Sequence, residues 1–178
     1  FYGGRYQEKN KKPLRGLALA RMIGHVTYLS DLSMAEKFGR EVLNDNFCYE
    51  KLDPVKFKIE SYLNYQGDKF ANEFDANSYI LLTKMLDYFD LAREYDNQPS
   101  SAFRVATCKF LVLTFSSDWR FPPERSREIT KALITAGCDV THAEITSSQG
   151  HDAFLLPNSR YEQIFSTFMR RVASTLER

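Results

Sequence analysis

CKFLVLTFSSD, residues 108–118, is the stretch that decides the fold. Residues 109–115 form a nearly continuous apolar run, which is typical of a parallel strand covered on both faces. A second, shorter strand is expected at residues 140–145, and it is followed by SSQGHDAF, residues 147–154. Both predicted strands therefore lead into loops that carry polar, chemically useful side chains.

Asp118 and His151 each follow the end of one of these strands and lie 33 residues apart. That interval accommodates one strand–helix–strand unit, and ligands bind beyond the carboxyl ends of such parallel strands. In acyl transfer, an Asp of this kind fixes the tautomer of a His that takes a proton from a nucleophile. No G-x-S-x-G nucleophile turn occurs in the chain. We therefore expect the carboxyl-terminal portion of an enzyme, inactive by itself.

The chain changes its pattern near DNQPSSAF, residues 96–103. After it, Pro122 to Gly137 has the end signals of a helix, and residues 159–176 form an amphipathic closing helix. Before it, the apolar spacing is helical throughout. Four helical segments are expected there, around residues 13–29, 30–43 (with Met34, Phe38 and Val42 on one face), 54–74 (starting at Pro54) and 75–89.

Composition limits the possible partners. The 24 basic and 23 acidic side chains give a formal charge of +1, so no net field favours nucleic acid or an anionic membrane. No apolar stretch is long enough to span a bilayer. Three cysteines without close spacing argue against a disulfide framework and a zinc site, and they favour a reducing cytoplasm. Cys48, Cys108 and Cys138 are interpreted as small buried residues.

Five stretches of the chain carry a resemblance to known proteins. They are GLALARMIGHVTYLSD (16–31), MAEKFGR (34–40), ESYLNYQGDKFANEFDANSYILLTKMLDYFD (60–90), FLVLTFSSDWRFPPERSREI (110–129) and GHDAFLL (150–156). Together they closely resemble the homoserine O-acyltransferases of the α/β-hydrolase superfamily, and the resemblance runs nearly end to end.

The resemblance implies an α/β fold, namely the carboxyl-terminal part of an α/β-hydrolase core preceded by a helical lid. Residues 1–104 would form the lid region, and residues 105–178 the last two parallel strands with their flanking helices. Asp118 and His151 would be the acid and the base of a Ser-Asp-His triad whose serine lies outside this chain. The implied reaction is a ping-pong transfer of an acyl group from acetyl-CoA or succinyl-CoA to L-homoserine, in methionine biosynthesis. Acyl-CoA would be a co-substrate, and no cofactor or metal is implied.

The resemblance also assigns substrate contacts and assembly. Arg21 and Tyr28 match family positions that contact homoserine, and Asp152 matches the expected partner of the substrate ammonium. Each has an ordinary structural alternative, because Arg21 can pair with Asp31 or Glu36, Tyr28 can be a core aromatic residue, and Asp152 can cap a turn. The family usually forms cytoplasmic homodimers through its lid helices.

Other interpretations remain open at this stage. Asp118 can also be an ordinary turn residue, because Ser-Ser-Asp before two prolines is a sequence typical of turns. An esterase that uses water as the acceptor would share the dyad but would not need Arg21 and Asp152. A non-catalytic helical interaction module is a third hypothesis. The apolar strand at 109–115 would then present an unprotected edge, so we expect the isolated chain to self-associate or rearrange. The residues do not decide between acetyl and succinyl donors.

Overall fold

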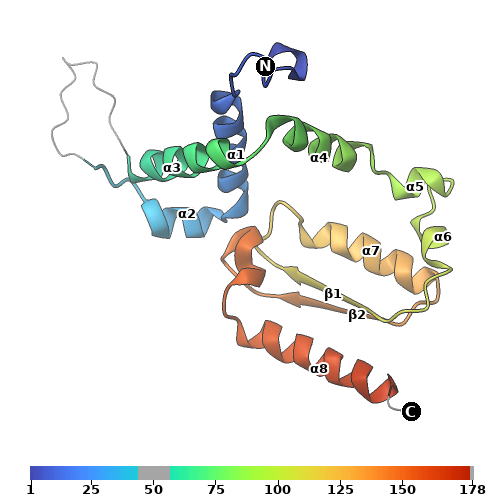
Figure 1. Cartoon of the computed structure of the whole chain (residues 1–178). Coiled ribbons are helices and arrows are strands. Elements are labelled where there is room, and N and C mark those ends of the chain that lie inside the picture. Colours follow the sequence, from blue (N-terminus) through green and yellow to red (C-terminus); the bar gives the residue numbers. More distant parts are fainter. Residues whose placement is uncertain (44–56, 177–178) are drawn as a thin grey trace. The chain divides into compact units, whose positions relative to one another are not determined.

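The structure is a computed structural model that describes residues 1–43 and 57–176 (Figure 1). The chain forms two compact units. Unit 1 comprises Phe1–Thr27 and Asp31–Phe89, and unit 2 comprises Tyr28–Ser30 and Asp90–Arg178. The short segment Tyr28–Ser30 belongs to the same unit as Asp118 and His151.

Among the described residues, no helix has the length and apolar character needed to cross a membrane.

Unit 1 is helical, as the apolar spacing predicts. Its elements are the 3-10 helix η1 (Tyr2–Gly4), α1 (Leu14–Tyr28), α2 (Asp31–Phe38), α3 (Lys58–Glu73) and α4 (Ala76–Tyr88). Its core consists of the buried residues Tyr6, Leu17, Ala18, Ala71 and Ala76. From Leu81 onward, α4 leaves apolar side chains exposed, among them Leu81, Leu82, Met85 and Leu86.

The helix expected at residues 30–43 is shorter than its apolar spacing suggests. Gly39 has a positive φ of +49°, a conformation that ends a right-handed helix, and α2 stops at Phe38. Val42 therefore does not share a helix face with Met34 and Phe38, and it forms an antiparallel bridge with Phe57 instead. The helix start predicted at Pro54 lies outside the described residues.

Unit 2 has the predicted strand–helix–strand–helix order. After the short helices α5 (Leu91–Glu94) and α6 (Pro99–Phe103) come β1 (Phe110–Phe115), α7 (Pro123–Thr135), β2 (Val140–Ile145), the 3-10 helix η2 (Gly150–Leu155) and α8 (Ser159–Leu176). The two strands pair in parallel, with Phe110 opposite Val140 and Phe115 opposite Ile145. This part of the chain therefore has the expected α/β class.

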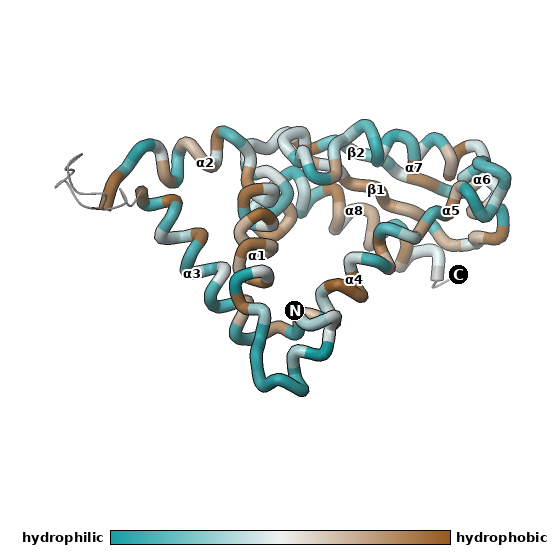
Figure 2. Tube along the Cα trace, turned by 90° about the horizontal axis from the view of Figure 1, so that it is seen from above, coloured by the Kyte–Doolittle hydropathy of each residue, from teal (hydrophilic) through white to brown (hydrophobic). Residues whose placement is uncertain are grey.

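Helices α7 and α8 lie on opposite faces of the two strands (Figure 1). On the α8 side, Phe115 and Ile145 are buried and pack with Tyr161 and Ile164. On the α7 side, the Arg127 guanidinium lies 2.6 Å from Glu144. Both strands carry hydrophobic residues, most continuously in β1 (Figure 2). β1 is half-buried along most of its length, and within the described residues β2 is its only neighbour.

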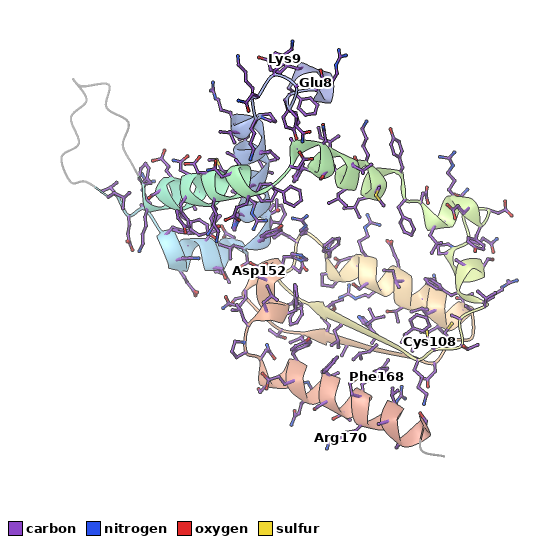
Figure 3. All side chains as sticks on the ribbon, in the orientation of Figure 1. Glu8, Lys9, Cys108, Asp152, Phe168 and Arg170 are labelled. Carbon is purple, nitrogen blue, oxygen red and sulfur yellow. The ribbon has the colours of Figure 1, made fainter. Side chains whose placement is uncertain are left out.

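The interpretation of the cysteines as buried residues is wrong for Cys108, which is exposed. It lies in the turn before β1, ahead of the first residue of the strand ladder (Figure 3). Cys138 is half-buried, and its Sγ lies 3.5 Å from the carbonyl oxygen of Phe103. Cys48 lies outside the described residues.

Candidate active site

Two loops leave the carboxyl ends of the strands and are joined to each other by successive hydrogen bonds. We name residues 116–122 the Asp loop and residues 146–158 the His loop. The backbone N–H of Ser147 donates to Ser116 Oγ over 3.1 Å, and the N–H of Gly150 donates to Ser117 Oγ over 2.9 Å. The strand pairing is thereby continued by side chains to the point where the candidate catalytic residues meet.

Asp118 and His151 form a hydrogen-bonded pair at the end of this series. Nδ1 of His151 lies 2.9 Å from Oδ2 of Asp118. The other carboxylate oxygen, Oδ1, accepts the backbone N–H groups of Arg120 at 3.0 Å and Phe121 at 2.9 Å. Asp118 is 8% exposed, and its carboxylate is held on both oxygens. The predicted proximity of the two residues is confirmed, while their catalytic role stays a prediction.

The geometry defines what the imidazole can do. A carboxylate at Nδ1 favours the tautomer with the proton on that nitrogen, so that Nε2 can accept a proton from an attacking hydroxyl. The charged imidazolium that results would be stabilised by the adjacent Asp118. Such a pair serves as a general base and then as a general acid in acyl transfer.

Three aromatic rings surround the imidazole of His151. The ring centroids of Phe121, Tyr28 and Phe154 lie 5.1, 5.7 and 6.0 Å from that of His151. The side chain of His151 is 21% exposed, which leaves it accessible. Beside the pair, an open groove of about 450 Å³ is lined by both dyad residues and by apolar side chains. These lining side chains include Leu111, Leu113, Phe115, Phe154 and Phe165.

The other predicted site residues lie in different places. Tyr28 contacts the dyad directly through its ring. Asp152 follows His151 on η2 (Figure 3) and is half-buried. Within the described part of the chain, no hydrogen bond engages its carboxylate. Arg21 belongs to unit 1, where its guanidinium lies 5.3 Å over the ring of Phe70.

The chain has two further histidines, one in each unit. Nδ1 of His25 on α1 lies 3.0 Å from the hydroxyl of Tyr62. His142 lies on β2, opposite Val112.

Four residues at the site were not singled out from the sequence. Trp119 and Arg120 follow the dyad aspartate, while Ser30 and Gly150 bring the segment 28–30 against the His loop. Two signals in the sequence could have pointed to these residues. One is the Gly before the histidine, and the other is the single Trp of the chain, next to the aspartate.

Comparison with known proteins places the chain in a family. No family model matches the chain. It is 59% identical over 172 residues to the homoserine O-succinyltransferase of Cellvibrio japonicus and 57% identical over 173 residues to that of Saccharophagus degradans. Both matches cover 97% of this chain. The chain belongs to the homoserine O-acyltransferase family. It spans 45% of the length of each of these two curated relatives.

Solved structures agree with this assignment at the level of the fold. The homoserine O-acetyltransferase from Bacillus anthracis matches 80% of this chain with a TM-score of 0.68 at 21% identity, and the match covers 38% of that protein. Esterase E22 matches 81% of the chain with a TM-score of 0.64 at 19% identity, and 39% of that protein is covered. The chain thus has the fold of the matched part of these α/β-hydrolase proteins, a fold that enzymes of different activity share.

Proposed function

We propose that the protein containing this chain is a homoserine O-acyltransferase of methionine biosynthesis. The observation that carries the proposal is the Asp118–His151 pair at the ends of parallel strands, in a chain 59% identical to a homoserine O-succinyltransferase. The sequence has no nucleophile turn. The serine would therefore come from a segment outside this chain.

The reaction would proceed in two acyl transfers. The serine oxygen attacks the thioester carbonyl of acyl-CoA while its proton passes to Nε2 of His151. The carbon–sulfur bond breaks, the CoA thiolate takes that proton, and an acyl-serine ester remains. The hydroxyl of homoserine then attacks this ester and gives its proton to Nε2, which returns it to the serine oxygen. Asp118 stabilises the imidazolium in both steps.

The acceptor would be held by groups of opposite charge. Asp152 lies one residue after the base with a half-buried carboxylate that no described residue bonds, which suits an ammonium group. Tyr28 lies against the imidazole. Arg21 is proposed to bind the carboxylate of homoserine, since guanidinium groups pair with carboxylates in a two-point geometry.

We propose succinyl-CoA as the acyl donor, in line with the names of the curated relatives. A succinyl group carries a carboxylate beyond the thioester, and this charge needs a cation near the dyad. Arg120 is the one Lys or Arg in the Asp and His loops, both of which the structure describes. Its Cζ lies 4.9 Å over the ring of Tyr28 and 5.9 Å over that of Phe121, two of the rings beside His151. These two contacts support Arg120 as the cation that would bind the far end of a succinyl group.

We further propose a homodimer located in the cytoplasm. The exposed apolar residues of α4 offer a surface that a second copy would cover. Cys108 and Cys138 are free thiols, which suits a reducing compartment. Light scattering on the full-length protein tests the dimer. A monomer at micromolar concentration would contradict it.

The activity is tested with the purified full-length protein. Succinyl-CoA, acetyl-CoA and simple esters are offered in turn, with homoserine present or absent, and released thiol and O-acylhomoserine are measured. We expect O-succinylhomoserine to form fastest. Hydrolysis that is independent of homoserine would instead support an esterase, the activity named for the E22 fold relative.

A further inference from the structure

The segment Tyr28–Ser30 contacts both loops that carry the dyad. It comprises the last residue of α1 and the two residues before α2, and it lies within unit 2. The Asp loop and the His loop are also joined directly, through Ser116, Ser117 and the Asp118–His151 bond. The segment therefore adds a third piece of chain to the pair of loops.

Its attachment to the Asp loop is made through Trp119. The indole Nε1–H, which can only donate, bonds to the carbonyl oxygen of Leu29 over 3.0 Å. Trp119 directly follows Asp118 and is 56% exposed. Because the indole is more than half exposed, this hydrogen bond is a specific contact that helps to orient it.

Its attachment to the His loop is closer. The hydroxyl of Ser30, a residue only 7% exposed, donates to the carbonyl oxygen of Ser148. Gly150 lies so near that a Cβ there would be 2.5 Å from the nitrogen of Ser30 and 2.6 Å from the oxygen of Tyr28. Real Cβ atoms do not approach backbone atoms so closely. A bare Cα is thus required immediately before His151.

We propose that the segment Tyr28–Ser30 is a positioning element that sets the register of His151 against Asp118, with Ser30 and Trp119 as its positioning residues. Each attachment is within a few residues of one dyad member, so the Asp118–His151 contact depends on where the segment lies. A misplacement of about 1 Å can lower a rate by about a hundredfold. That the segment positions His151 for catalysis rests on the proposed function.

The full-length protein carrying Ser30→Ala, Trp119→Phe or both changes tests this proposal. Each single variant is expected to lower kcat about tenfold, while the KM for homoserine stays within about twofold and the melting temperature within a few degrees. Ser174→Ala is the matched control, since Ser174 Oγ also donates to a backbone carbonyl, that of Arg171, on α8. It should leave kcat unchanged.

A second readout does not require turnover. The proton shared by Nδ1 of His151 and Asp118 should give a downfield ¹H NMR signal in the wild type, weakened or shifted in Ser30→Ala and Trp119→Phe and unchanged in Ser174→Ala. If the wild-type protein transfers no acyl group, the proposed function is wrong. The NMR signal alone then tests the positioning role. Variants with the wild-type signal and kcat would overturn the positioning role.

Discussion

Asp118 and His151, 33 residues apart in the chain, meet with Nδ1 of the imidazole 2.9 Å from Oδ2 of the carboxylate. The remaining oxygen of Asp118 is fixed by two backbone N–H groups of its own loop. The carboxylate thus has little freedom to rotate away from the histidine. The pair is held from the aspartate side by its own turn and from the histidine side by the segment Tyr28–Ser30.

Replacement of the dyad carboxylate is expected to abolish most activity without unfolding the protein. In Asp118→Asn the amide can still accept the N–H groups of Arg120 and Phe121, but it no longer stabilises the imidazolium or the required tautomer. We expect kcat to fall by about 10⁴-fold. Steady-state kinetics of the full-length protein measure this change. Asp139→Asn, which alters an exposed carboxylate paired with Lys109 and Arg171, is the control and should keep near-normal kcat.

Arg120 is expected to discriminate between acyl donors. Arg120→Leu removes the cation proposed to bind the succinyl carboxylate, so kcat/KM for succinyl-CoA should fall by about 10- to 200-fold, the equivalent of a lost charged hydrogen bond of 1.5–3 kcal/mol. The value for acetyl-CoA should change much less. Competition between the two donors measures the ratio directly. Equal losses for both would show that Arg120 supports the loop and does not select the donor.

Gly150 and Gly137 should respond differently to the same substitution. Both have a positive φ, +73° and +80°, so alanine is strained at either position. No atom lies within 4 Å of a Cβ at Gly137, where the cost should be about 1–2 kcal/mol. At Gly150 the added Cβ also collides with the backbone of Tyr28 and Ser30. We expect Gly150→Ala to lose activity and to be less stable than Gly137→Ala in urea unfolding. If the two variants have comparable stability and activity, Gly150 does not approach the backbone of Tyr28 and Ser30 closely.

The Tyr6–Asp75 hydrogen bond makes unit 1 sensitive to acid. The hydroxyl of Tyr6 donates to the carboxylate of Asp75, and this bond, followed by the N–H of Ser78, lowers the pKa of Asp75. The same bond, with burial, raises the pKa of Tyr6. A lowered carboxyl pKa stabilises the folded state above the ordinary value of 3.8, and this stabilisation is lost as the pH falls through the folded pKa.

Tyr6→Phe should therefore raise the pKa of Asp75 and lower stability most near neutral pH. The difference from wild type should narrow as the pH falls below about 4, where the carboxylate becomes protonated. Thermal unfolding from pH 3 to pH 7 measures this difference. Tyr65→Phe, at a tyrosine that is 64% exposed, should show a small, pH-independent change. A gap between wild type and Tyr6→Phe that stays constant with pH would contradict the linkage.

Much of unit 2 could be predicted because its local signals agree with its packing. The closing helix and β2 have the predicted bounds, and α7 lies between the expected proline and glycine signals. Gly137 ends α7 with two backbone bonds, from its own N–H to Ile134 and from Cys138 to Leu133. Prediction was poorer at α2, because the positive φ of Gly39 overrides an apolar spacing that continues to Val42.

The sequence by itself determined the order of strands and helices, the dyad at the strand ends and the family, because these depend on local periodicity and on residue identity along the chain. Only the tertiary structure decided which backbone atoms approach that dyad. The contact of Gly150 with Ser30 and the bond from Trp119 to Leu29 join residues about 90 to 120 positions apart. No local pattern encodes such pairs, since they arise when packing places one piece of chain against two loops.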